Sequence, residues 1–301
     1  MTTTQRRRVT GMRAPLLTVV AAALTLTSAC GLNGGSVPMS GGAGASGAPT
    51  AAVTPKTPQA PAGQVLLQVD VAPGFVPYEY VLATRPFLTV YADGRVIVTR
   101  SAKGWPDFVG QPVPLRLGHL DAATVRRLVE QWRSSGAFSV DKPNFGSPAV
   151  TDLPTTVLRM RDSSGHLVQR SIYALDTGFG AIGLTSSQQR LRSETVHLIS
   201  RTQAAVGRTT AYIPQRISVV QLDHPVPSSR APHGTREWPG PALRAVLQPQ
   251  TDGSPCATLR GVVALSVLRA AGDNPSLSWR EGQLVHRLVV RALLPREPGC
   301  G

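Results

Sequence analysis

The stretch FLTVYADGRVIVT, residues 87–99, constrains the fold more than any other part of the chain. Two arms rich in Val, Leu, Ile and Thr flank Asp93 and Gly94, and an Asp-Gly pair between such arms is typical of a tight β-hairpin. Just upstream, residues 65–71 (VLLQVDV) carry apolar side chains at every second position, which is the period of a strand. Together they predict antiparallel sheet.

A helix is predicted directly after this hairpin and the loop that follows it. Asp121 is placed to cap its first turn, and Gly136 can close it. Between them, apolar side chains recur at spacings of three and four, which is the pattern of a helix with one buried face. This stripe consists of Val125, Leu128, Val129 and Trp132.

The order of hairpin and helix then repeats. Residues 155–175 (TTVLRMRDSSGHLVQRSIYAL) contain two β-rich arms around an Asp-Ser-Ser-Gly connection, which predicts a second hairpin. Thr185 and Gln188 fit a capping box at the start of a second helix, and Gly207 is placed to end it.

The C-terminal third reverses this order. A strand is predicted within 212–222, followed by a proline-rich stretch from 223 to 253. Ser254 and Pro255 are suited to open a helix as cap and first residue, and residues 276–295 alternate as a final hairpin. The predicted class is α+β, an antiparallel sheet of hairpins with covering helices, and this arrangement allows two subdomains.

The N-terminal residues have the composition of an export signal. Four arginines and no carboxylate precede an apolar run at 14–26, and small residues lead to Cys30. These are the three parts of a secretory signal peptide. The apolar run is too short to cross a bilayer, which takes about 20 apolar residues.

The residues Ser28-Ala29-Cys30-Gly31 resemble the lipobox of bacterial lipoproteins. The sequence departs from this pattern at Thr27, where the family usually has Leu. The resemblance implies that residues 1–29 are removed and that Cys30 is acylated, palmitate included, which anchors the protein on the extracytoplasmic face of the cell membrane. The segment ALLPREPGC, residues 292–300, resembles the C-terminal end of uncharacterised actinobacterial lipoproteins. An ordinary secreted protein remains the alternative.

The next segment is predicted to be a tether. Residues 30–63 contain no aromatic residue and no carboxylate, and Gly, Pro, Ala, Ser and Thr dominate them, so little apolar surface is available for folding. A flexible chain of this length spans roughly 30 Å. The predicted organisation is therefore a signal peptide at 1–29, the lipidated tether at 30–63, a hairpin-helix domain at 64–222, and the proline-rich connection with a helix-hairpin unit at 223–301.

The cysteine count and the net charge limit which partners the protein can have. With Cys30 assigned to the lipid, Cys256 and Cys300 remain as a predicted disulfide of an exported protein, and two unpaired buried thiols are the alternative. The formal charge is +14, which is compatible with an anionic wall polymer. Only three of the 31 basic residues are lysines and the arginines are scattered, a pattern that GC-rich coding also produces. Export argues against nucleic acid as a partner.

The sequence contains only weak matches to known catalytic motifs. Ser139 and Lys142 satisfy S-x-x-K, but the motif follows the predicted helix instead of opening one. His224 and His233 flank a proline-rich loop, where exposed histidines without function are commoner than ligands, and no H-E-x-x-H is present. No metal and no cofactor is predicted.

Two further groups of residues are predicted to have packing roles. His197 and His286 lie in periodic segments, which favours satisfied packing residues. Loop aromatics such as Phe75, Trp105 and Trp238 are predicted to fold back over the edge of the core.

These observations favour a lipid-anchored envelope protein with a non-enzymatic binding or structural role, with another envelope protein or a wall polymer as partner. Two alternatives remain open. One is an envelope hydrolase or transferase whose site is assembled from scattered residues. The other is a solute-binding lipoprotein, against which the hairpins argue, because that class alternates strands and helices in parallel sheets.

Overall fold

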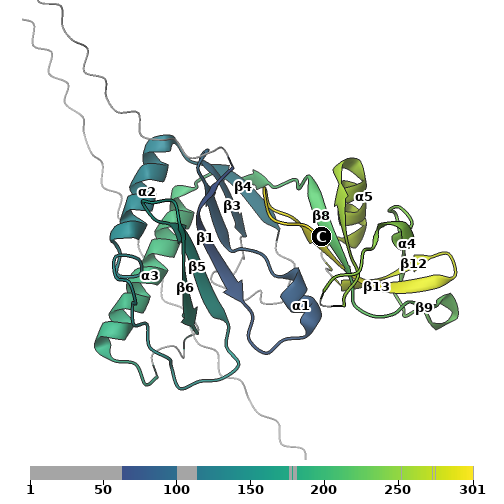
Figure 1. Cartoon of the computed structure of the whole chain (residues 1–301), viewed down its shortest axis with the longest axis horizontal. Helices are drawn as coiled ribbons and strands as arrows, with labels where there is room; N and C mark the ends of the chain where they lie inside the picture. The colour runs from purple at the N-terminus through teal and green to yellow at the C-terminus, as the bar shows by residue number, and fades with distance from the viewer. Residues whose placement is uncertain are drawn as a thin grey trace, which may run out of the picture. The chain divides into compact units, whose positions relative to one another are not determined.

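The computed structural model describes residues 63–99, 114–175, 178, 182–251, 253–272, 274 and 276–300. The predicted signal peptide, Cys30 and the tether up to residue 62 lie outside these described residues, as does Trp105. Helices and mainly antiparallel sheets confirm the predicted α+β class (Figure 1). Both sheets belong to the same unit of the chain.

The first sheet has the strand order β6-β5-β1-β2-β3-β4-β7, and every neighbouring pair is antiparallel. Strand β1 pairs with β2 on one side and with β5 on the other. The strands are β1 (Val65–Ala72), β2 (Leu88–Tyr91), β3 (Arg95–Thr99), β4 (Leu115–His119), β5 (Thr155–Arg161), β6 (Leu167–Tyr173) and β7 (Thr210–Ala211).

Both hairpins predicted in this region are present. Gly94 turns the chain between β2 and β3 at a φ of 85°, a left-handed conformation that glycine adopts without strain. Between β5 and β6, Gly165 has a φ of 84° and its N–H donates to the carbonyl of Asp162 at 3.1 Å. Turn residues of the right type at the right place therefore set the register of each pair.

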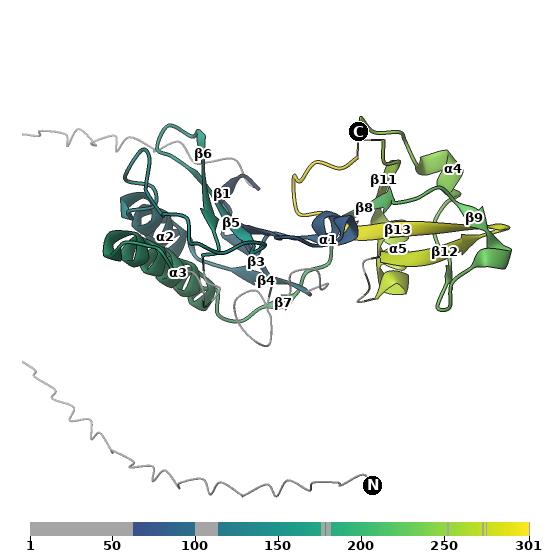
Figure 2. The ribbon, with the colours of Figure 1, turned by 90° about the horizontal axis from the view of Figure 1, so that it is seen from below.

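Helices α2 (Ala122–Ser134) and α3 (Ser186–Ala205) cover one face of the first sheet, as both views show (Figures 1 and 2). The predicted caps are confirmed: the Asp121 carboxylate accepts from the Thr124 N–H at 2.8 Å, and Thr185 and Gln188 form the capping box. The whole predicted stripe of α2 is buried, and Trp132 at its C-terminal end is completely buried. Burial of these side chains against the sheet forms the larger core.

The second sheet has the order β10-β12-β13-β8-β11, and β9 also pairs with β13. All of its pairs are antiparallel except β10 with β12. The final predicted hairpin corresponds to β12 and β13. The strands are β8 (Arg216–Gln221), β9 (Val226–Pro227), β10 (Arg236–Glu237), β11 (Cys256–Arg260), β12 (Ser276–Glu281) and β13 (Leu284–Ala292).

Three further helices complete the described residues: α1 (Tyr78–Ala83), α4 (Leu243–Val246) and α5 (Gly261–Ala271), with a short 3-10 turn at Ser228–Arg230. Helix α5 packs on the second sheet, and its buried residues join Trp279 in a separate core. Among the residues that the structure describes, no helix combines the length and the apolar character needed to cross a membrane.

The predicted helix start at Ser254 and Pro255 is wrong. Residues Cys256–Arg260 form strand β11, which pairs with β8 over its full length, and α5 begins only at Gly261. The apolar residues in this segment fit the spacing of a helix as well as that of a strand. Pairing with β8, about 40 residues upstream, decides in favour of a strand. Not every apolar residue of α5 is buried, because Val262 is 81% exposed. Its buried residues are Ala264, Val267 and Ala271.

The division between the two sheets falls earlier than the boundary predicted at 222 and 223. Strand β8 pairs with β11 and β13, so it belongs to the C-terminal sheet although it lies within the predicted 64–222 domain. Its side chains Ile217 and Val219 are completely buried in the second core. Burial against the strands that follow it therefore places β8 in the second sheet.

Candidate functional site

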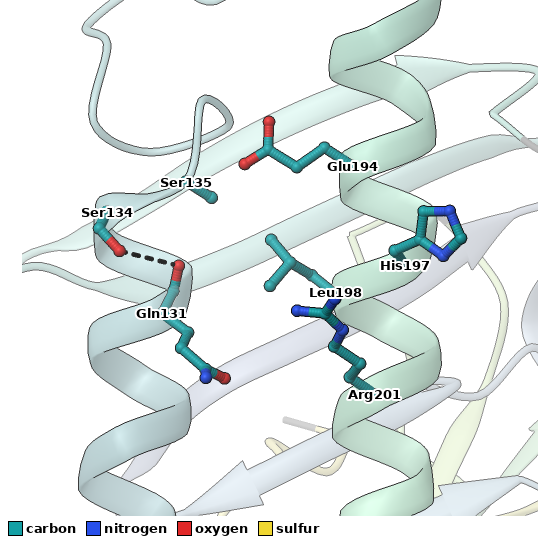
Figure 3. A pocket seen from close by; sticks show the side chains of 7 residues that line it. All are labelled: Gln131, Ser134, Ser135, Glu194, His197, Leu198 and Arg201. Atoms are coloured by element: carbon teal, nitrogen blue, oxygen red, sulfur yellow. Dashed lines mark hydrogen bonds between the residues drawn. The ribbon is translucent and has the colours of Figure 1, made fainter.

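A groove lies between the two helices that cover the first sheet. Its volume is about 320 Å³, and Figure 3 shows side chains of α2 facing those of α3 across it. We call it the helix groove. It is lined by Gln131, Ser134, Ser135, Glu194, His197, Leu198 and Arg201.

Helical periodicity brings these residues together. Glu194, His197 and Arg201 are spaced at three and four along α3, so they lie on one exposed face next to the buried stripe. Gln131 and Ser134 occupy the matching rim of α2. The floor is apolar, since Leu198 is only 8% exposed and belongs to the core.

The hydroxyl groups of the groove serve the end of α2. Ser134 Oγ donates to the carbonyls of Glu130 and Gln131 at 2.9 and 3.3 Å, and Ser135 Oγ donates to the Trp132 carbonyl at 2.7 Å. A serine nucleophile needs a base that accepts its proton. In the described contacts these hydroxyls donate to backbone carbonyls instead.

The charged groups lie at opposite ends of the groove (Figure 3). Glu194 accepts from the Gly136 N–H at 3.3 Å, where the chain leaves α2, and this contact holds the carboxylate in place. Arg201 follows seven residues later, about 10 Å further along the helix axis. The helix groove therefore offers an acceptor at one end and a cation at the other, with the Gln131 amide on the facing helix. The His197 ring extends from α3 on the side away from α2 (Figure 3). This arrangement suits an extended polar segment.

The cysteines of the folded part are paired. Cys256 and Cys300 form a disulfide, with their Cα atoms 5.6 Å apart and a sequence separation of 44 positions. The Cys300 N–H also donates to Thr258 Oγ1 at 2.8 Å. The bridge fixes the C-terminal segment to strand β11, where a helix was expected.

The other candidates from the sequence do not form a site. Ser139 and Lys142 are exposed in the irregular segment after α2, so the S-x-x-K match does not open a helix. His224 and His233 are both exposed. Across the described residues, no group of three or more His, Cys, Asp or Glu side chains is placed to hold a metal ion.

The packing predictions have mixed outcomes. His286 is buried, as predicted, and its Nδ1 lies 3.2 Å from Gln221 Oε1, whereas its Nε2 has no hydrogen-bond partner among the described residues. The prediction for His197 is wrong, because it is exposed on the rim of the helix groove. Trp238 covers the core edge, edge to face with Trp279 at 5.4 Å between ring centroids, whereas Phe75 remains 90% exposed.

Sequence reasoning missed the helix groove as a whole. Its signal was available: on each predicted helix, polar residues flank the apolar stripe at helical spacing. Nothing in the sequence pairs the rim of one helix with the rim of the other, however. That pairing follows from the way both helices pack on the same sheet.

Comparison with known proteins returned no match: no protein-family model, no curated protein and no solved structure is significantly similar to this chain.

Proposed function

We propose that this chain is an exported, lipid-anchored protein of the cell envelope that binds a partner through its folded part. The observation that carries the proposal is the division of its three cysteines. Cys256 and Cys300 are joined to each other, which leaves Cys30, directly after the apolar export segment, as the single remaining thiol.

Redox chemistry supports export. Disulfides persist in oxidising compartments outside the cytoplasm and are rare within it. Acylation of Cys30 would then provide attachment, because each buried methylene contributes about 0.8 kcal/mol and two or more chains are needed for a stable anchor. The segment from residue 31 to 63 would give the folded part a reach of roughly 30 Å from the membrane.

The helix groove supports binding as the role of the folded part. Its serines and its carboxylate are engaged with backbone groups, while Gln131, His197 and Arg201 are exposed on its rim. Such side chains can supply directional hydrogen bonds above an apolar floor, which is the usual composition of a binding site. An extended polar segment of an envelope protein or a wall polymer would suit it.

Detergent-phase partitioning tests the anchor. The wild-type protein, expressed in a host that processes lipoproteins, is expected in the detergent phase and Cys30→Ser in the aqueous phase. The double variant Cys256→Ser/Cys300→Ser is the matched control, because it removes thiols without removing the lipid site and should stay with the detergent. Retention of Cys30→Ser in the detergent phase would refute lipidation at this residue.

Site-specific crosslinking on intact cells tests the groove. A photoreactive residue in place of His197 is expected to capture a reproducible protein or glycan, and Arg201→Glu in the same chain should abolish the capture. The control position is Ser163, which is exposed in the turn between β5 and β6. Equal labelling from both positions, or none from either, would contradict a binding role for the groove.

A further inference from the structure

A second feature lies where the chain after β13 contacts the first sheet. Leu294 is buried there against Tyr91, and the Tyr212 hydroxyl donates to the Leu293 carbonyl at 3.1 Å. This small core is separate from the two larger ones. We call the basic residues around it the arginine cluster: Arg85, Arg95, Arg216, Arg291 and Arg296.

Two of these arginines converge on Glu297. Arg291 Nη2 lies 2.6 Å from Glu297 Oε1, and Arg216 Nη2 donates to the Glu297 backbone carbonyl at 2.6 Å. The second oxygen of the carboxylate accepts from the Leu294 N–H at 2.8 Å. Glu297 is therefore fully engaged by Arg291 and by the backbone.

Two others flank Gly63, at the start of the described chain. A Cβ atom on Gly63 would lie 3.3 Å from Arg95 Nη2 and 3.4 Å from Arg296 Nε, so both guanidinium groups approach the same point. Arg95 also sits over the ring of Tyr91, 5.3 Å from its centroid, and pairs with Asp93 at 2.7 Å.

Arg85 lies near Arg291 and Glu297. It donates to the carbonyl of Thr84, its own neighbour in sequence, and the described contacts give it no carboxylate. The residue as a whole is half-buried. Burial first, and then the nearby Arg291 cation, hold the pKa of Arg85 well below its ordinary value, and Glu297 offsets this only in part. A desolvated cation beside a second cation is costly unless an anion joins them.

A neighbouring donor is also unused. Tyr91 is completely buried, and its hydroxyl has no hydrogen-bond partner among the residues that the structure describes. Burial raises the pKa of this phenol, with Tyr212 and Glu297 adding to the shift, so the hydroxyl keeps its proton and remains a donor at neutral pH. Buried polar groups are rarely left without a partner.

The charges do not balance. The described contacts give the five arginines two carboxylates, Asp93 and Glu297, which leaves a net charge of +3 from 5 minus 2. Guanidinium groups bind phosphate oxygens through paired, charge-assisted hydrogen bonds, and a phosphate group accepts several donors at once. We propose that the arginine cluster binds the phosphate group of a phosphate ester. This inference rests on the cluster and is independent of lipidation at Cys30.

Binding is tested on the full chain carrying Cys30→Ser, with inorganic phosphate and glycerol 1-phosphate as probes in calorimetric titrations at constant ionic strength. Saturable binding is expected. Arg85→Gln and Arg296→Gln should each weaken it at least tenfold, while Arg190→Gln, an exposed arginine of α3, should leave it unchanged. Arg296 is itself exposed, so its variant keeps the test valid if Arg85→Gln fails to fold.

Flotation with vesicles identifies the source of the phosphate. Phosphatidylglycerol vesicles are compared with phosphatidylcholine vesicles of equal size. Binding to the anionic vesicles that is lost in Arg85→Gln and Arg296→Gln, but kept in Arg190→Gln, supports the proposal with a lipid headgroup as ligand. Binding of glycerol 1-phosphate alone supports it with a soluble ester. Absence of both, or equal weakening by all three variants, would overturn it.

Discussion

The indole N–H of Trp132 on α2 donates to the hydroxyl of Thr202 on α3 at 3.0 Å, and both side chains are completely buried. The Thr202 hydroxyl in turn donates to the Leu198 carbonyl at 2.8 Å. One buried hydroxyl thus accepts from one helix and donates within the other. The two walls of the helix groove are held together by this bond in the core beneath it.

Replacing Thr202 by Val should destabilise the protein by about 1–3 kcal/mol, since the shape is retained and the buried indole N–H loses its acceptor. Urea denaturation followed by tryptophan fluorescence measures the change. Ser200→Ala is the matched control, because Ser200 is exposed two residues earlier on the same helix. If both variants lose equally little stability, the hydrogen bond does not contribute measurably to the stability of the protein.

Arg192 supports the loops next to the helices. It is 4% exposed, and its guanidinium donates to the carbonyls of Tyr173 at 2.9 Å, of Phe145 at 3.4 Å and of Ala174. Burial lowers the pKa of Arg192, but these carbonyls satisfy its donors. Arg192→Met should lower the free energy of unfolding by about 1–3 kcal/mol for each carbonyl that is left buried and unpaired. Arg190→Met, on the exposed face of α3, should change the thermal midpoint little.

The disulfide should contribute about 4 kcal/mol to the free energy of unfolding in the chain-entropy account of a closed loop of this length. Cys256→Ser/Cys300→Ser is expected to lose that amount in denaturation at neutral pH. Wild-type protein in excess reductant should approach the same value. Two thiols that react with alkylating agents in the native, unreduced protein would contradict the pairing.

Acid should destabilise the second sheet through His286. Its imidazole is buried, and burial lowers its pKa below the ordinary 6.5, with Glu281 opposing the shift in part. The unfolded chain therefore binds the proton more readily than the folded one. Stability from this group is complete above pH 6.5 and falls as the pH drops from there toward the lowered folded value.

The difference between two pH values isolates this effect. The urea midpoint should decrease more between pH 8 and pH 5.5 in the wild type than in His286→Gln. His224→Gln, which changes an exposed histidine, should behave like the wild type. An equal fall in all three proteins would show that other groups account for the acid sensitivity.

Local features of the fold were predictable where the information lies within a few residues. Asp93 and Gly94 predicted their turn, and Asp121 and Thr185 predicted their caps, because a turn or a cap is a contact between residues two to four positions apart. The pairing of Cys256 with Cys300 followed from counting cysteines, not from geometry.

Features that depend on distant partners were not predictable in the same way. Residues 256–260 form a strand because β8 offers backbone groups to pair with, and Val262 is exposed because α5 starts later than its apolar pattern suggests. The arginine cluster is an extreme case. Arg85 and Arg291 are about 200 residues apart, and in the sequence each is one of many scattered arginines.

The sequence by itself determined the hairpins, the helix caps, the α+β class and the expectation of export, since periodicity, turn chemistry and composition act over short windows. Tertiary structure alone decided which sheet β8 joins, which helix rims face each other across the groove, and where arginines gather beyond their carboxylate partners. The physical reason is that burial and charge depend on the whole surroundings of a side chain. Only the packed chain brings those surroundings together.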